Sequence, residues 1–246
     1  MDRSNLIFLD TETTGIGPDG RLCQLGYIFR GEEYEGLFKP PVPIEIDAMA
    51  VSHITNRMVA DKEAFIGSKA HKKLQEILAD GNILVAHNAQ FDVEILKREG
   101  IVPQKIIDTF KVAQHLDEEA VIPRYGLQYL RYYFDLEVPD ATAHTALGDV
   151  RVLVKIFEHL FARMLESSQD EQKVLTEMIE ISARPILIKR FIFGKYVGER
   201  VMDVAERDPG YLKWLLAEKV KAREQGGPDD EDWVYTIEHY LELFCR

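Results

Sequence analysis

Residues 6–12 read Leu-Ile-Phe-Leu-Asp-Thr-Glu, a continuous apolar run that ends in two acids. A short apolar run of this kind is typical of a strand buried within a sheet. Because residues two apart on a strand point to the same face, Asp10 and Glu12 should lie next to each other. We therefore expect an α/β fold in which this strand carries two carboxylates into one site.

Three further candidate residues stand in short patterns downstream. Asp92 closes the hexapeptide His-Asn-Ala-Gln-Phe-Asp, while His144 and Asp149 begin and end His-Thr-Ala-Leu-Gly-Asp. Four acids that a fold brings together cannot all stay ionised at close range without cations. Carboxylate oxygens without a cysteine or histidine cluster suit Mg²⁺ or Mn²⁺ better than zinc. We expect Asp10, Glu12, Asp92 and Asp149 to hold such metal ions.

The expected metal site favours phosphoryl chemistry. Paired magnesium ions, roughly 3.5–4 Å apart, commonly activate a water and stabilise the leaving oxygen in phosphodiester cleavage. A neutral imidazole can take a proton from the attacking water near neutral pH, so we assign His144 as the general base. Residues 150–161 are apolar at helical spacing, which places Asp149 in the first turn of a helix, where the dipole favours a carboxylate.

These motifs, in this order and intact, resemble those of the DnaQ-like 3′-5′ exonucleases of the DEDDh type. The resemblance implies a ribonuclease H-like mixed sheet flanked by helices. It also implies that Asp10, Glu12, Asp92 and Asp149 bind two metal ions and that His144 is the base. Each motif alone is a weak signal, whereas the ordered combination is strong.

Several other positions invite a substrate role. In similar proteins a loop like residues 48–55 lies beside the terminal nucleotide, often with a histidine two residues before Ile-Thr; Ser52 stands there instead, followed by His53. Ile16, at the tip of the loop after the metal strand, could press against the last base. The residues expected to contact substrate are Thr13, Ile16, His53, Asn88, Phe91 and Lys195.

A rival motif overlaps the first one. Residues 15–20 satisfy the glycine-rich dinucleotide fingerprint, and Glu35 follows at the distance that fingerprint expects. The fingerprint must open a helix, yet residues 22–29 have the pattern of a second strand. Asp10 and Glu12 would also repel a pyrophosphate, so we interpret the glycines as a hairpin-type loop.

The remaining patterns complete the expected domain. We expect strands at residues 35–38, 83–86 and 106–107, a helix at 69–78, and a helix that carries Asp92 and stops at Gly100. Three strands followed by alternating elements fit the mixed sheet that the resemblance implies.

The composition bounds the class of protein. The chain has 246 residues, a formal net charge of −12 and 46% hydrophobic residues, enough for one full domain and a smaller unit. No apolar stretch approaches the roughly 20 residues of a membrane span, and the N-terminus lacks a signal-peptide pattern. Cys23 and Cys245 form no disulfide framework, so we expect a cytoplasmic protein that does not contact a membrane.

The charge argues against a general binder of nucleic acid and less against an enzyme that acts on a strand end. It is uneven, however, because residues 184–200 contain five basic residues and one acid, with aromatic residues interleaved. Such a stretch can hold phosphates and stack bases, or it can be a half-buried strand pair with solvated lysines.

A polar segment near residues 166–172 marks a boundary. Beyond it we expect a hairpin at 193–198 and a helix-turn-helix at 203–215, a stretch that resembles the C-terminal part of exodeoxyribonuclease X-like proteins. The expected domains are an exonuclease domain at 1–165, a linker at 166–184 and a small C-terminal α+β accessory region at 185–246.

The resulting hypothesis is a metal-dependent 3′-5′ exodeoxyribonuclease that releases nucleoside 5′-monophosphates from the 3′ ends of single-stranded or duplex DNA, with DNA repair as its natural role. Two alternatives stay open. A 3′-5′ exoribonuclease would use the same site, since no residue visibly reads a 2′-OH. A nucleic-acid end-binding module without catalysis is the second.

Overall fold

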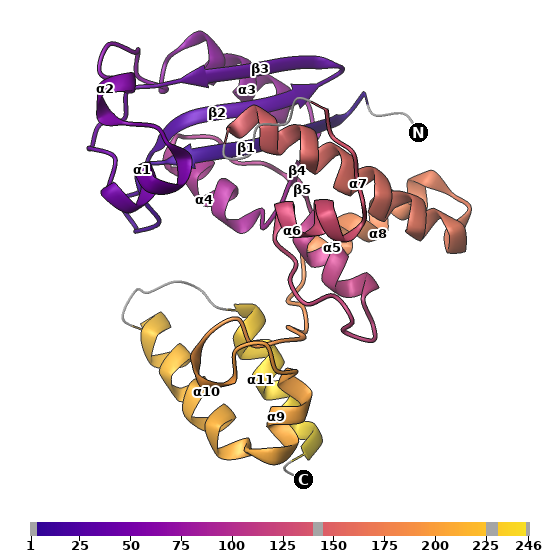
Figure 1. The fold of residues 1–246 in the computed structure, drawn as a ribbon. Coiled ribbons are helices and arrows are strands. Elements are labelled where there is room, and N and C mark those ends of the chain that lie inside the picture. The colour runs from indigo at the N-terminus through magenta and orange to yellow at the C-terminus, as the bar shows by residue number, and fades with distance from the viewer. Residues whose placement is uncertain (1–3, 140–144, 225–230, 245–246) are drawn as a thin grey trace. The chain divides into compact units, whose positions relative to one another are not determined.

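The computed structural model describes residues 4–139, 145–224 and 231–244 (Figure 1). The chain divides into two units, one made of Met1–Phe110 with Gly126–Ile179 and the other of Lys111–Tyr125 with Glu180–Arg246. The grouping of residues 111–125 with the C-terminal residues had no counterpart in the sequence patterns. The domain assignment made from the sequence stays a prediction.

The first unit is built on a mixed five-stranded sheet with the strand order β3-β2-β1-β4-β5. β1 (Leu6–Thr13) is central, and β2 (Leu22–Phe29) and β3 (Glu32–Leu37) follow it in antiparallel pairing. β4 (Ile83–Ala86) and β5 (Lys105–Asp108) are parallel to β1 on its other side. A strand buried between two neighbours explains why residues 6–9 are all apolar.

Helices cover both faces of this sheet (Figure 1). On one face, Ile7 and Leu9 of β1 join a core with Leu74 of α3 (Lys69–Ala79) and Leu96 of α4 (Gln90–Arg98). On the other face, Phe8 meets Phe157 of α7 (Ala146–Ser168) edge to face, with ring centroids 5.2 Å apart. The first unit also contains α1 (Ile46–Ser52), α2 (Asn56–Val59), α6 (Leu127–Tyr133) and most of α8 (Glu171–Ser182), whereas most of α5 (Thr109–Leu116) belongs to the second unit.

Most elements expected in this unit are found where the sequence predicts them. The strands at residues 22–29 and 83–86 are confirmed, and the predicted helix at 69–78 extends by one residue. The third strand begins at Glu32 rather than at residue 35, because Arg30 and Gly31 adopt positive φ angles of 53° and 80° and close a two-residue hairpin directly after β2. Three of the six residues of β3 are glutamates, so no apolar pattern marks where this strand begins.

The loop at residues 14–21 returns the chain from β1 straight into β2. The amide of Thr14 donates to the carbonyl of Arg21 at 2.9 Å, so the glycines lie between two antiparallel strands and open no helix. The interpretation of this segment as a hairpin-type loop is therefore confirmed, and a pyrophosphate-binding helix is absent at this position.

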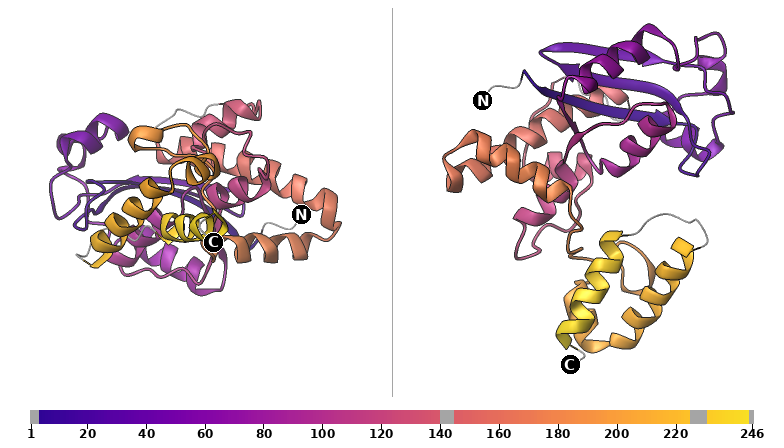
Figure 2. Two further views of the ribbon diagram at one scale, coloured as in Figure 1. Left: turned by 90° about the horizontal axis from the view of Figure 1, so that it is seen from below. Right: turned by 180° about the vertical axis from the view of Figure 1, so that it is seen from behind.

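The second unit contains a helical core. Three helices pack side by side in it (Figure 2): α9 (Val201–Arg207), α10 (Pro209–Glu224) and α11 (Glu231–Phe244). Their shared core includes Phe191 and Trp233. The expected helix-turn-helix is confirmed, with its turn at Asp208. The expected hairpin at 193–198 is a chain reversal through a 3₁₀ turn, η1 (Gly194–Tyr196), closed by one bridge between Arg190 and Arg200.

None of the helices that the structure describes is long and apolar enough to cross a membrane.

Candidate active site

Asp10 and Glu12 lie on the same face of β1, as the strand pattern predicts. Their partners on β2 are Gly26 and Gln24, which sit on that face too. Both partners touch the start of α7, so the two carboxylates point toward the first turn of that helix. One carboxylate oxygen each from Asp10, Glu12 and Asp149 lie within 4.8 Å of one another.

Close packing of α7 on β2 brings Asp149 to this position. A Cβ atom on Gly26 would lie 2.6 Å from the carbonyl carbon of Ala146, so only glycine allows the helix start to approach this closely. The amide of Ala146 donates to Oε1 of Gln24 at 3.2 Å, and the Thr145 hydroxyl caps the helix by accepting from Gly148. Asp149 is thus fixed in the first turn, where the helix dipole favours its charge.

Asp92 comes from the first turn of α4 and is buried. Its Oδ1 accepts a 2.7 Å hydrogen bond from the hydroxyl of Thr11, the residue between Asp10 and Glu12. Asp92 is not part of the three-carboxylate cluster, yet its charge raises the pKa of both Asp10 and Glu12. All four acids therefore share one electrostatic environment.

The pKa values of three of these acids, Asp10, Glu12 and Asp92, are raised. Burial, followed by repulsion from Asp92, Glu12 and Asp149, raises the pKa of Asp10 well above its usual value. Burial and then the charges of Asp149 and Asp92 raise the pKa of Glu12 to about 7. Burial raises the pKa of Asp92 to about 7 despite the opposing hydrogen bond from Thr11.

A set of oxygen donors with this much mutual repulsion fits divalent metal ions. A bound cation would relieve both the repulsion and the unfavourable burial of charge, and carboxylate oxygens are the ligands that Mg²⁺ and Mn²⁺ prefer. Metal binding is thus supported by the chemistry of the donors, independently of any motif.

Two residues near the acids carried no motif in the sequence. Nε2 of Gln128, on α6, donates to Oδ1 of Asp149 at 2.6 Å, while its Oε1 is buried without a hydrogen-bond partner in the described part of the chain. Asp108, at the end of β5, accepts from the amides of Asn88 and Ala89 at 2.9 and 3.0 Å and so fixes the start of α4. Thr11 could have been found, because it alternates with the two acids on β1.

The residues expected to contact substrate near the acids have mixed surroundings. Thr13 is buried and its hydroxyl donates to the carbonyl of Gly15 at 3.1 Å. Ile16 is 91% exposed at the loop tip, as expected for a residue that could meet a base. Asn88 has a φ of 59°, which asparagine tolerates in the tight turn between β4 and α4. Phe91 packs against the core.

The other expected residues lie elsewhere or outside the described part. His53 is exposed and ends α1 with a φ of 59°. Lys195 belongs to the second unit, where its ammonium pairs with Asp208 at 3.0 Å. His144 lies outside the described residues.

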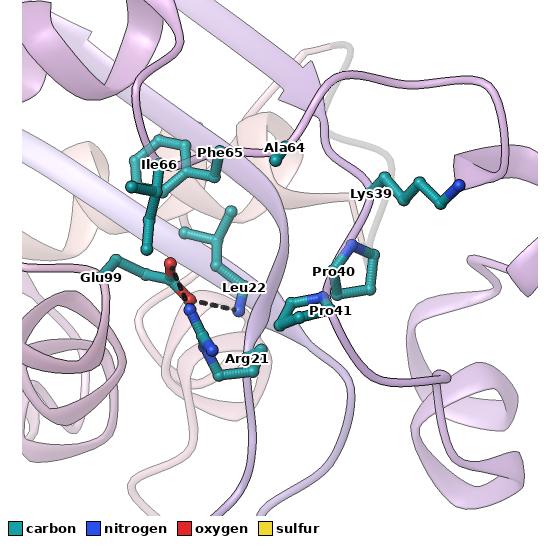
Figure 3. A pocket seen from close by; sticks show the side chains of 9 residues that line it. All are labelled: Arg21, Leu22, Lys39, Pro40, Pro41, Ala64, Phe65, Ile66 and Glu99. Carbon is teal, nitrogen blue, oxygen red and sulfur yellow. Dashed lines mark hydrogen bonds and ion pairs between the residues drawn. The ribbon is translucent and has the colours of Figure 1, made fainter.

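A separate pocket of about 510 Å³ lies in the first unit (Figure 3). At its base, the guanidinium of Arg21 and the amide of Leu22 both donate to the buried carboxylate of Glu99. None of the residues expected at the metal site or at the substrate lines it; its walls are Arg21, Leu22, Lys39, Pro40, Pro41, Ala64, Phe65, Ile66 and Glu99.

Comparison with known proteins agrees with this geometry. Residues 7–157 match the family model described as "Exonuclease", and residues 191–219 match the model described as "Exodeoxyribonuclease X-like C-terminal". The chain therefore belongs to the exonuclease family, whose members depend on metal ions, and it is a nuclease.

Individual relatives extend the match over nearly the whole chain. The chain is 31% identical to Exodeoxyribonuclease 10 of Escherichia coli (strain K12), over 96% of this chain and 99% of that protein. It is 32% identical to the DNA polymerase III subunit epsilon of Treponema pallidum, over 62% of this chain and 74% of that protein. The solved structure "Exonuclease X in complex with 5' overhanging duplex DNA" matches with a TM-score of 0.56 at 26% identity, over 72% of this chain and 99% of that one. The ribonuclease H-like fold expected from the sequence is confirmed.

Proposed function

We propose that this protein is a metal-dependent 3′-5′ exodeoxyribonuclease that hydrolyses phosphodiester bonds at DNA 3′ ends and releases nucleoside 5′-monophosphates. The observation that carries the proposal is the convergence of carboxylate oxygens from Asp10, Glu12 and Asp149 within 4.8 Å, with Asp92 coupled to them. The names of the relatives favour DNA over RNA as the substrate.

In this proposal Asp10, Glu12, Asp92 and Asp149 hold two Mg²⁺ or Mn²⁺ ions. When bound, such ions make a water more nucleophilic and stabilise the leaving oxygen. His144, at the first position of the His-x-Ala-x-x-Asp motif, takes the proton from the attacking water.

Two neighbouring side chains orient the proposed ligands. The hydroxyl of Thr11 donates to Oδ1 of Asp92, and the side-chain amide of Gln128 donates to Oδ1 of Asp149, so each contact restricts the orientation of a proposed metal ligand. Both donors lie outside the set of acids, so neither adds charge to the site.

The proposed substrate contacts surround these ligands. Ile16, exposed at its loop tip, presses against the terminal base, and Thr13, His53, Asn88 and Phe91 shape the site around it. Lys195 contacts the strand from the second unit. We propose a role in DNA repair in the cytoplasm, where the buried free thiol of Cys23 would stay reduced.

The decisive experiment uses DNA and RNA oligomers of one sequence, labelled at the 5′ end, with Mg²⁺. A 3′-5′ exonuclease produces a ladder of labelled strands that shorten one nucleotide at a time, whereas the opposite polarity releases a labelled mononucleotide at once. We expect the ladder on DNA, and we expect Asp92→Ala and His144→Ala to abolish it with an unchanged circular dichroism spectrum.

The other outcomes are equally readable. A ladder on RNA alone would make the protein an exoribonuclease. Binding of ends without release from either oligomer would make it an end-binding module. Equal activity of Asp92→Ala would overturn the metal assignment.

A further inference from the structure

The second unit carries aromatic rings and cations on one surface, which we call the ring-cation surface and define as Lys195, Tyr196, Arg207, Tyr211 and Trp214. Nζ of Lys195 lies 4.5 Å from the centroid of the Tyr196 ring and 4.9 Å from that of Tyr211. The guanidinium carbon of Arg207 lies 5.3 Å from the Tyr196 ring. Trp214 continues the row, with its ring centroid 5.5 Å from that of Tyr211.

Asp208 holds this surface in place from the turn between α9 and α10. One carboxylate accepts from the Tyr196 hydroxyl at 2.6 Å, from Nζ of Lys195 at 3.0 Å and from the Tyr211 amide at 3.1 Å. These bonds lower the pKa of Asp208 to about 2, the hydrogen bond from Tyr196 contributing most, so the carboxylate stays ionised near neutral pH. The rings are therefore fixed before any ligand arrives.

Trp214 is not needed for the core of the unit. The core aromatics are Phe191 and Trp233, whose rings stack at 5.3 Å, and Trp233 is 5% exposed. Trp214 is 54% exposed on α10. A large rigid ring held in solvent next to cations is a platform for a flat ligand.

The charge of this region is opposite to that of the chain. Residues 184–224 contain ten Lys and Arg and six Asp and Glu, a net charge of +4, in a chain of net charge −12. α10 exposes three cations, Lys213, Lys221 and Arg223, and two acids, Glu218 and Glu224. The local excess of positive charge favours binding of a polyanion to this segment, within a second unit whose residues 111–125 and 180–246 contain 13 Lys and Arg and 16 Asp and Glu.

We propose that the ring-cation surface binds a single strand of DNA, with a base stacked on Trp214 and phosphates held by Lys195 and Arg207. Alternating rings and cations match the alternation of bases and phosphates along a strand. The present partners of the cations are partly exposed, Asp208 at 33% and Glu199 at 42%, and ion pairs of this kind at a surface contribute little, so a phosphate can take the place of either carboxylate. We expect an unpaired strand to bind, because a base inside a duplex is stacked on both faces.

The inference rests on the proposed function, since the bound strand is the substrate that the first unit degrades. The two units are joined covalently, so a strand held by one is present at high effective concentration for the other. The consequence is that the enzyme removes more nucleotides from a long strand before it dissociates.

Intrinsic fluorescence tests the surface directly, because the chain has two tryptophans and one of them is buried. The full-length protein is titrated with an oligothymidylate in EDTA, which prevents cleavage. We expect the strand to quench the emission of Trp214. Trp214→Leu should lose the quench and weaken binding about 5- to 150-fold, the range for one stacked base. Trp214→Phe should lose the quench and keep most of the affinity.

Tyr235→Leu is the matched control. Tyr235 is 42% exposed on α11, and its ring lies tilted against that of His239 with centroids 6.4 Å apart, outside the ring-cation surface, so its loss should leave both affinity and quench unchanged. Wild-type affinity in Trp214→Leu would overturn the proposal. Heparin, a polyanion without bases, serves as a second control, and a quench and an affinity equal to those of DNA would also overturn the proposal.

Cleavage separates this proposal from the proposed function. Trp214→Leu should degrade a trinucleotide at the wild-type rate and lose processivity on a long strand. A wild-type protein that shows the quench but releases no nucleotide would overturn the proposed function and leave the surface intact.

Discussion

The two units of the molecule differ in how their charged side chains are arranged. Around β1 and α7, acids are crowded until burial and repulsion raise the pKa values of Asp10, Glu12 and Asp92. Around α9 and α10, cations lie over half-buried rings, and Asp208 has a lowered pKa. The first arrangement is unfavourable until a divalent cation binds, whereas the second is stable alone and attracts a polyanion.

Of the two regions, only the acidic one shows a functional requirement through the free energy of its folded state. Repelling carboxylates destabilise a fold, so a site like this one persists because its ligand or its chemistry requires it. The ring-cation surface does not lose folding free energy to repulsion between like charges. Only a binding experiment can therefore show whether it has a function.

Neutralising one of the crowded acids tests how much the repulsion between the carboxylates destabilises the fold. Asp10→Asn removes a charge that Asp92, Glu12 and Asp149 all repel, so we expect nuclease activity to fall by at least about 1000-fold. In EDTA we expect the same variant to melt roughly 2–4 °C higher than wild type, because about 1 kcal/mol of repulsion is gone.

End-labelled cleavage assays and thermal melts with and without Mg²⁺ measure both effects. Added Mg²⁺ should raise the melting temperature of the wild type and have little effect on Asp10→Asn. Unchanged cleavage, or a variant that is less stable in EDTA, would remove the contrast between the two regions.

How far the sequence predicts this site depends on the kind of contact. The apolar run of residues 6–9 and the alternation of Asp10 and Glu12 are local patterns with a direct geometric meaning, so β1 and its shared face could be predicted. Asp149 could be placed in a helical first turn for the same reason.

Contacts between separate elements could not be predicted in this way. Gln128 stands in Leu-Gln-Tyr-Leu, which has no pattern that marks it, and its approach to Asp149 follows from the packing of α6 on α7. β3 was predicted only in part because three of its six residues are glutamates, and its start depends on the φ angles of Arg30 and Gly31. The role of His144 stays a prediction from its motif.

Gln128 offers a smaller and more selective perturbation of the acidic region. Gln128→Leu keeps the volume but removes the donor to Asp149, so we expect the Mg²⁺ concentration for half-maximal activity to rise about 10- to 100-fold. Activity at saturating Mg²⁺ should return toward the wild-type value. Gln128→Asn, with a shorter amide, should show the same defect, and the melting temperature of both should change little. A loss of activity that high Mg²⁺ does not restore would mean that Gln128 acts on something other than the ligand.

The smallest expected effect concerns Asp117 of the second unit, whose carboxylate, unlike that of Asp10, is stabilised by several hydrogen bonds. Burial alone would raise the pKa of Asp117, but the hydrogen bond from the Tyr125 hydroxyl at 2.5 Å and those from the amides of Ile122 and Val121 outweigh it and lower the pKa. Since the folded pKa lies below the unfolded value of about 3.9, the ionised carboxylate stabilises the unit above about pH 4, and this stabilisation is lost as the pH falls through the folded pKa.

Asp117→Asn should therefore melt a few degrees below the wild type at pH 6, and the gap between the two melting temperatures should narrow below pH 4. Melts of both proteins from pH 3 to pH 6 measure the gap, in which the titration of all other groups cancels. A gap that does not change with pH would mean that Asp117 acts through its shape rather than its charge, and the two regions would then differ less in their use of carboxylates than their pKa values indicate.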